Sequence, residues 1–259
     1  MESNADALAR IIAEMSKGMQ DSGAAERIAE KIASGKATYS DAYAYARESG
    51  RVMTKAMKKH LPTVLTDGRL YRETAETVIR EPMQIGAADV IDISAEIQGE
   101  LNDLAGIGIQ AIRPEINDDQ INGIITGIAN AEDYASGENT LLQQIANFLE
   151  GTVDDCVHDN AEFHYNAGLS PTIERRADAK CCSWCSALAG VYDYGDIKDK
   201  GNDVYRRHNN CHCEVLYNPG DGSKRRQNVH SKKWAEDGRA ERIATAQRMA
   251  EEWKNNKRR

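Results

Sequence analysis

Prolines are rare and widely spaced in this chain, and their spacing limits which regular structures it can form. The 259 residues contain five prolines, at positions 62, 82, 114, 171 and 219. Because proline ends or bends a helix, the long intervals between these positions permit long helices. Pro171 marks a change of pattern, since helical periodicity precedes it and short alternating segments follow it.

Before this proline, apolar residues recur at three- and four-residue steps, which is typical of amphipathic helices. The best periodic segment is 139–166, in which Leu141, Ile145 and Val153 belong to one apolar stripe. Cys156 lies on the same stripe, so we expect it in the core rather than at a site. Further helices are predicted over residues 4–17, 24–33, 40–60, 69–80, 84–104 and 117–128, with Asn4, Ser40 and either Asn117 or Asp118 at three of their starts.

The segments that follow this proline are typical of short strands. Thr172–Arg176, Val191–Tyr194 and Glu214–Tyr217 contain β-branched or aromatic residues and are separated by Gly, Asp and Asn. A module of roughly 50 residues buries little apolar surface, so it usually needs a cross-link or a metal to stay folded. A last helix is predicted from Trp234 to about Trp253.

Charge is divided unevenly along the chain, whose formal net charge is −8. Residues 223–259 hold 12 of the 33 basic and 5 of the 41 acidic residues, so this tail carries +7 and the rest −15. Such a tail suits nucleic acid or an acidic protein ring, but interspersed acids favour a solvated helix. No segment has the roughly 18 apolar residues of a membrane span, and we expect no signal peptide.

Five of the six cysteines lie between positions 181 and 213. Cys182 and Cys185 form a C-x-x-C motif, in which one tight turn presents two thiolates to one ion. His208, Cys211 and Cys213 follow after 22 intervening residues, a spacing similar to that of zinc ribbons. Thiolates and imidazole select zinc over magnesium or calcium. We predict a structural zinc site made by Cys182, Cys185, His208 and one of Cys211 or Cys213.

Other interpretations of the same cysteines are buried free thiols or a disulfide such as Cys182–Cys213. Cys181 is adjacent to Cys182, so binding of both to one ion would strain the loop. His212 lies between two cysteines, and on a strand its side chain would point away from them.

Two enzyme classes use similar residues, but neither pattern is complete here. Zinc deaminases place H-x-E before P-C-x-x-C, whereas here His212–Glu214 follows the C-x-x-C, which no proline precedes. P-loop, G-x-S-x-G and H-E-x-x-H motifs are also missing, so we expect no enzymatic activity. One alternative is a DNA-binding accessory protein. The other is a metal-dependent nuclease without a visible acidic cluster, its candidate residues being Arg206, Arg207, His208, Asn209 and Asn210.

These observations predict a mainly α protein. It would consist of a long-helix body (1–168), a small zinc-stapled α+β module resembling a zinc ribbon (169–222) and a basic helical tail (223–259).

Residues 172–217 resemble the C-terminal module of the Mu F-like minor head, or head morphogenesis, proteins of tailed bacteriophages. That module reads as a strand with arginine and aspartate, then C-x-x-C, a leucine and a glycine, and finally H-x-x-C-x-C. Arg206 and Arg207 stand where relatives often have a proline, and His212 where they often have arginine. The matching residues here are Arg176, Asp178, Cys182, Cys185, Leu188, Gly190, His208, Cys211 and Cys213.

The resemblance implies a minor capsid protein of the virion, made in the bacterial host cytoplasm and present in few copies. Such a protein associates with the portal or the inner capsid and assists head assembly or DNA delivery. Its expected partners are the portal and the major capsid protein, and packaged DNA through the tail at 223–259. We expect it to be oligomeric in the virion, with no contact to a membrane.

Overall fold

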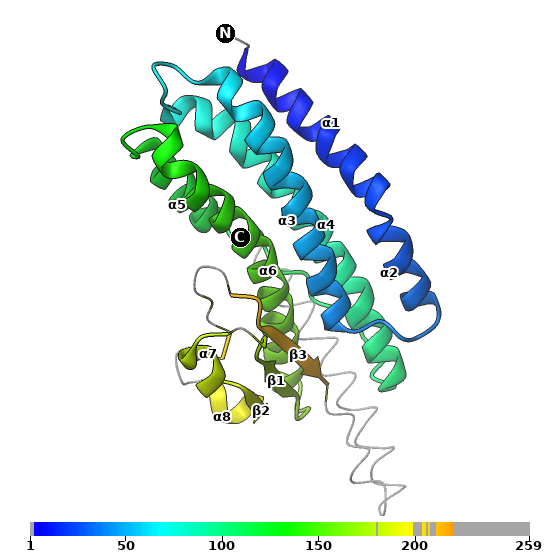
Figure 1. The fold of residues 1–259 in the computed structure, drawn as a ribbon. Helices are drawn as coiled ribbons and strands as arrows, with labels where there is room; N and C mark the ends of the chain where they lie inside the picture. The colour runs from blue at the N-terminus through cyan, green and yellow to red at the C-terminus, as the bar shows by residue number, and fades with distance from the viewer. Residues whose placement is uncertain (1–2, 180, 199–203, 206, 208–210, 220–259) are drawn as a thin grey trace, which may run out of the picture.

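The computed structural model describes residues 3–179, 181–198, 204–205, 207 and 211–219. Helices dominate these residues, and three short strands form one small sheet (Figure 1). The predicted fold class, a mainly helical protein with a small α+β module, is confirmed in these ranges. The helix predicted from Trp234 to Trp253, with the rest of the tail at 223–259, lies outside the described residues.

The helical body is an assembly of long helices that pack along one another. α3 contacts α1, α4 and α6, and α4 contacts α1, α5 and α6. Figure 1 shows α1, α3 and α4 side by side, with α6 running from α5 toward the strands. The helices are α1 (Asn4–Ser22), α2 (Ala24–Ala33), α3 (Tyr39–His60), a short 3-10 turn (Leu61–Val64), α4 (Arg72–Leu104), α5 (Asp118–Ala129) and α6 (Tyr134–Asn166).

Side-chain caps fix where several helices begin. Ser3, and not Asn4, caps α1, because its hydroxyl accepts the N–H of Asp6 at 3.1 Å. Thr38, two residues before the expected Ser40, caps α3 by a reciprocal pair of bonds with Asp41. Asn117, one of the two residues predicted there, caps α5. Asp133 caps α6, which therefore starts five residues before the predicted 139.

α4 is one helix where the sequence predicts two. It runs 33 residues and passes through Pro82, which is buried. An interior proline costs about 3 kcal/mol, because it removes a backbone hydrogen bond and crowds the preceding turn. Ile79 and Met83 on either side of it are both fully buried, so packing of the flanking turns outweighs that cost.

The connection between α4 and α5 is an apolar loop that covers the end of α6. Ile107, Ile109 and Ile112 pack against Phe163 in a small cluster of their own. Asn160 on α6 satisfies the loop backbone, since its side chain accepts from Ile112 N at 2.9 Å and donates to Ile112 O at 2.9 Å. Apolar packing and these two hydrogen bonds hold the loop against α6.

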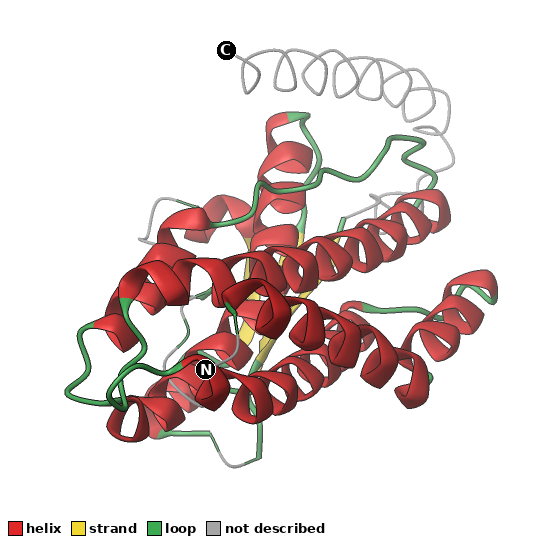
Figure 2. Ribbon diagram, turned by 90° about the horizontal axis from the view of Figure 1, so that it is seen from above, coloured by secondary structure: helices red, strands yellow, loops and turns green. Residues whose placement is uncertain are grey.

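The sheet has the strand order β2-β1-β3, with β1 antiparallel to both neighbours. The strands lie where the sequence predicts them, except that Tyr194 begins α8 instead of ending β2. Figure 1 shows the sheet beside α6, and Figure 2 shows the strands lying against the helices. β3 contacts both α3 and α6. The elements are β1 (Thr172–Arg176), α7 (Ser183–Ala187), β2 (Gly190–Asp193), α8 (Tyr194–Ile197) and β3 (Glu214–Asn218).

One hydrophobic core continues from the helices into the sheet. Ile173 on β1 and Val215 and Tyr217 on β3 belong to the same buried cluster as Tyr39 and Phe148 of the body. The division of the chain at residues 168 and 222 stays a prediction. The sheet is nevertheless anchored on the body by shared apolar packing.

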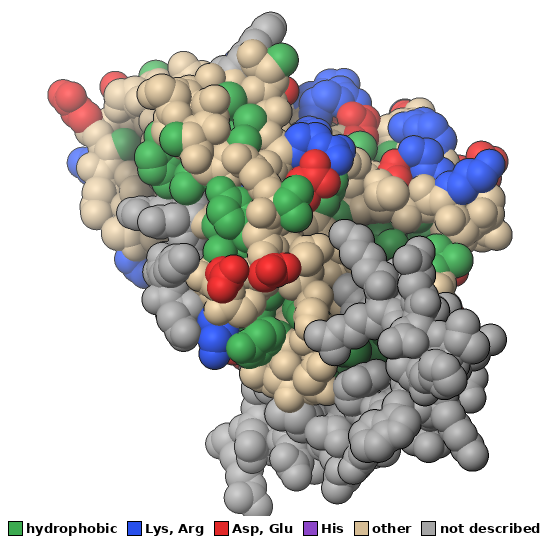
Figure 3. Space-filling view, turned by 90° about the horizontal axis from the view of Figure 1, so that it is seen from below, with side chains coloured by type: hydrophobic (Ala, Val, Ile, Leu, Met, Phe, Trp, Pro, Cys, Tyr) green, Lys and Arg blue, Asp and Glu red, His purple; other side chains and the backbone are tan. Residues whose placement is uncertain are grey.

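The surface carries charges of both signs. Figure 3 shows a face on which basic and acidic side chains lie close together along one edge. Pairs such as Arg51–Glu48, at 2.6 Å, are exposed and contribute about 0–1 kcal/mol each. None of the helices in the described ranges combines the length and the apolar character that a membrane span requires.

Candidate metal centre

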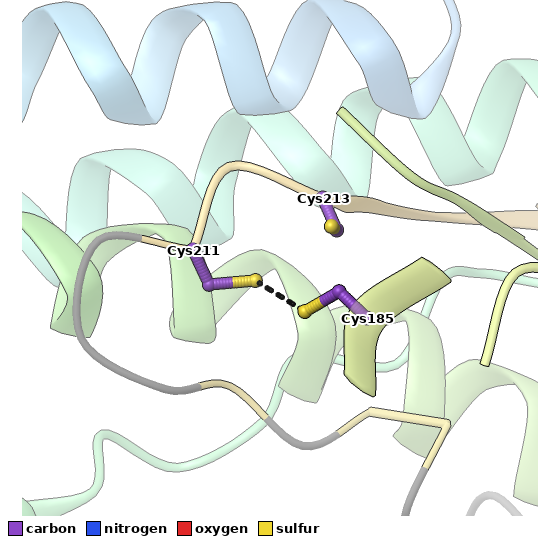
Figure 4. A group of neighbouring side chains, drawn as sticks. All are labelled: Cys185, Cys211 and Cys213. Carbon is purple, nitrogen blue, oxygen red and sulfur yellow. Dashed lines mark hydrogen bonds between the residues drawn. The ribbon is translucent and has the colours of Figure 1, made fainter. Parts of the chain in front are cut away.

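Three cysteines from two separate segments of the chain come together. Cys185 is on α7, whereas Cys211 and Cys213 lie on the segment that leads into β3. All three are buried, and their sulfur atoms lie within 4.8 Å of one another. Figure 4 shows the three side chains converging, with the Cys185 and Cys211 sulfurs 3.7 Å apart.

This geometry fits a tetrahedral zinc ion. Zinc–sulfur bonds of about 2.3 Å place two sulfurs of a tetrahedron about 3.8 Å apart, which matches the Cys185–Cys211 separation of 3.7 Å. All six cysteines are free thiols, so the alternative disulfide between Cys182 and Cys213 is not formed in this structure. Three buried soft donors in one place are a suitable set for zinc and an unsuitable one for magnesium or calcium.

The five predicted ligands are placed differently from one another. Cys185, Cys211 and Cys213 come together, so Cys211 and Cys213 both lie where they could bind one ion with Cys185. Cys182 is the exposed N-cap of α7, outside this thiol group, and its sulfur accepts the N–H of Cys185 at 3.5 Å. His208 lies outside the described residues, so its role stays a prediction.

Arg175 of β1 is a neighbour of the three thiols that the sequence did not identify. It is 2% exposed, and its Nη2 lies 3.7 Å from the Cys185 sulfur and 3.9 Å from the Cys211 sulfur. The family resemblance indicated Arg176, which is exposed and pairs with Glu174 at 3.0 Å. The alternation of side chains along β1 could have identified Arg175. Ile173 faces the core, and Arg175, two residues later, must face the same way.

The positive charge of the Arg175 guanidinium affects the protonation of the Cys185 thiol. Burial raises the pKa of Cys185 to about 12, and the hydrogen bond from Arg175 opposes that rise. A metal ion binds thiolates, so its binding releases protons from such thiols. Arg175 would offset part of the negative charge of the thiolates around a divalent ion.

The other cysteines and His212 behave as expected from the sequence. Cys156 is 1% exposed in the core, and burial raises the pKa of its thiol well above the usual range. Cys181 is half-buried beside the thiol group. His212 points away from the cysteines, with Nδ1 at 2.9 Å from Glu150 Oε1.

The residues considered for nuclease or deaminase chemistry are occupied elsewhere or not described. The Arg207 side chain, 9% exposed, lies between Asp154 and Glu150 of α6. Burial alone would lower the pKa of Arg207, but Asp154 raises it overall well above its ordinary value. Glu214 accepts from Arg47 at 3.0 Å and from Ser40 at 2.7 Å, so it faces α3. Arg206, His208, Asn209 and Asn210 lie outside the described residues.

A second group of potential ligands lies on α6, where His158, Asp159 and Glu162 come close together. The His158 ring donates to or accepts from Asp159 at 3.3 Å and packs edge-on against Tyr205 at 5.1 Å. His158 is thus paired with Asp159 and packed against Tyr205.

The chain was compared with protein families, curated proteins and solved structures. No curated protein and no solved structure matches it. The model of the VG15 protein family matches residues 36–237, which include every element from α3 to β3. The matched segment covers well over half of the chain, and it contains both the helical body from α3 onward and the three-cysteine centre. The chain therefore belongs to the VG15 protein family, a family of viral, phage-type proteins.

Proposed function

We propose that this protein is a minor capsid protein of a tailed bacteriophage, of the Mu F-like head morphogenesis type, with one structural zinc ion. It associates with the portal or the inner capsid and assists head assembly or DNA delivery. The observation that carries the proposal is that one viral family pattern, over residues 36–237, spans both the helical body and the cysteine module. Its location is the virion, and before that the cytoplasm of the host during assembly.

The cysteine centre supports a structural role for the metal. Cys185, Cys211 and Cys213 are at most 2% exposed, and a closed site with four protein ligands leaves no position for substrate. Cys182 and His208 are the candidates for the fourth ligand. When bound, zinc would supply folding free energy, about 10–16 kcal/mol in small zinc modules, and no chemistry. We accordingly propose that the protein is not an enzyme.

The direct test of the assignment is mass spectrometry of purified virions and of isolated portal complexes. We expect this chain in both, in few copies per particle. Its absence from both preparations would refute the proposal. The zinc part is tested separately, by metal analysis and native mass spectrometry of the purified chain. One zinc per chain is expected, and it should be lost in the Cys185→Ser variant.

The rival hypothesis, a metal-dependent nuclease, makes an opposite prediction. Purified protein should leave plasmid DNA uncut in the presence of magnesium, manganese or zinc. Cutting that disappears in the His208→Ala variant would favour the nuclease. Contact with packaged DNA through residues 223–259 is tested by oligonucleotide binding, which should weaken with salt and disappear when the tail is removed.

A further inference from the structure

The segment of residues 211–213, here called the cysteine segment, is held by the carbonyl oxygens of all three of its residues. Arg207 donates from Nη1 to the Cys211 carbonyl at 3.0 Å and from Nη2 to the Cys213 carbonyl at 2.8 Å. The carbonyl of His212 accepts from Nη2 of Arg47 at 2.9 Å. Two guanidinium groups, one near the segment and one from α3, therefore fix the backbone that presents two thiols.

Two buried carboxylates of α6 hold both arginines in turn. Glu150, whose side chain is 2% exposed, lies 3.2 Å from Arg47 Nε and 3.4 Å from Arg207 Nη1. Asp154 pairs with Arg207 through Nε and again at 3.1 Å from Nη2. Because a buried charge without a partner is unfavourable, these four groups restrict one another's positions.

Arg47 uses the whole planar fork of its side chain. Its Nε pairs with Glu150 on α6, its Nη1 with Glu214 on β3 at 3.0 Å, and its Nη2 with the carbonyl of His212. Lysine has a single ammonium group and cannot reproduce three bonds in these fixed directions. Arg47 therefore joins α3, α6 and the cysteine segment at one point.

We propose that Arg47 is a positioning residue of the metal centre, so that the helical body sets the metal affinity of the cysteine module. The inference rests on the structural metal site of the proposed function. Arg47 acts on the backbone between two ligands, in the way that outer groups orient ligands in other metal sites. Removal of such a group typically weakens metal binding 10- to 100-fold.

The test is the zinc affinity of the full chain, measured at fixed pH by competition with a chromophoric chelator. Arg47→Met removes the fork and keeps an unbranched stem. Arg51→Met is the matched control, because Arg51 lies one turn further along α3, is 61% exposed and pairs with Glu48. We expect affinity to fall 10- to 100-fold in Arg47→Met and to change less than twofold in Arg51→Met.

Two further measurements separate positioning from a general loss of structure. Cobalt-loaded Arg47→Met should keep the thiolate-to-cobalt absorption of the wild type, since the ligands are unchanged. Amide exchange of residues 211–218 in metal-free protein should be faster in Arg47→Met and unchanged in Arg51→Met. If Arg47→Met does not fold, Arg47→Lys, which keeps the charge beside Glu150, replaces it and is expected to lose part of the affinity.

Equal affinities and equal exchange rates in the two methionine variants would overturn the inference. If the wild-type chain takes up no zinc, the metal part of the proposed function fails instead. The positioning role is then decided by exchange alone, and unchanged exchange of residues 211–218 in Arg47→Met overturns it.

Discussion

His164 gives this protein a built-in sensitivity to acid. The side chain is fully buried on α6, with Nδ1 hydrogen-bonded to the hydroxyl of Tyr217. Burial lowers the pKa of His164 from 6.5 to about 4. Folding therefore holds the imidazole neutral at pH values where the unfolded chain would protonate it.

The sign and the size of the effect follow from these two pKa values. A histidine whose pKa is lowered by folding does not reduce the free energy of unfolding above pH 6.5. That free energy falls as pH decreases from about 6.5 toward 4. With these values the loss is about 2 kcal/mol at pH 5 and about 3 kcal/mol at pH 4.

Asp155 on the same helix titrates in the opposite sense. Burial, and then the neighbouring Asp154, raise the pKa of Asp155 to about 6. Its contribution to stability therefore increases as pH falls from about 6 toward 4, because the folded state binds the proton first. The pH dependence of the wild type alone is thus a sum of opposed effects, so the contribution of His164 must be isolated with a variant.

The assay is urea unfolding at pH 7.5 and pH 5 of the wild type and of His164→Gln, which keeps a polar side chain but does not titrate. The stability difference between the two proteins should shift by about 2 kcal/mol in favour of the variant at pH 5. His158→Gln is the control, because Asp159, through its side-chain hydrogen bond, raises the pKa of His158. Its shift should have the opposite sign. Parallel losses in wild type and His164→Gln would refute the reasoning.

Two other substitutions test the packing of the body. Gly18→Ala should destabilise the protein by about 1–3 kcal/mol, because a Cβ there would lie 2.6 Å from Cγ1 of Val52 on α3. At Gly99 on α4 an added Cβ meets no atom within 4 Å, so Gly99→Ala should stabilise the protein by up to about 1 kcal/mol. Thermal melts in which Gly18→Ala and Gly99→Ala change the melting temperature equally would contradict these helix contacts. Asn160→Ala should cost about 2–4 kcal/mol, because it leaves the N–H and the carbonyl of Ile112 without their partner. Amide exchange should rise in residues 105–117 and stay constant in α1, and uniform exchange across the chain would argue against a local role.

The sequence predicts most helices and all three strands because their signals are local. Proline spacing and apolar periodicity identified the body, but α6 starts before its apolar stripe, at a capping box formed by Asp133 and Ser136. Pro82 misled the prediction for α4, because the rule that proline ends a helix takes no account of the packing around it. Local patterns thus locate elements better than they locate boundaries.

The contacts of the candidate site likewise fall into local ones, which the sequence can predict, and long-range ones, which it cannot. The cysteine spacing predicted one shared site for Cys185 and one of Cys211 or Cys213, whereas the structure brings all three thiols together and leaves Cys182 outside. Arg47 and Glu150 are 103 residues apart in the sequence, and their pairing follows only from the packing of α3 on α6. Contacts of this kind have no local signature, so only the structure identifies them.

The charged contacts between α6 and Arg207 have a consequence for biosynthesis. Glu150 and Asp154 leave the ribosome 57 and 53 residues before Arg207. The hydroxyl of Tyr43 likewise accepts a hydrogen bond from the backbone N–H of Val215, which is made 172 residues later. During translation, α3 and α6 can pair early and Arg47 can already bind Glu150, but Asp154 on their shared face lacks its partner Arg207, which has not yet been made. The nascent helices should therefore stay loosely packed there until the cysteine segment emerges, and final closure of the body should coincide with completion of the module.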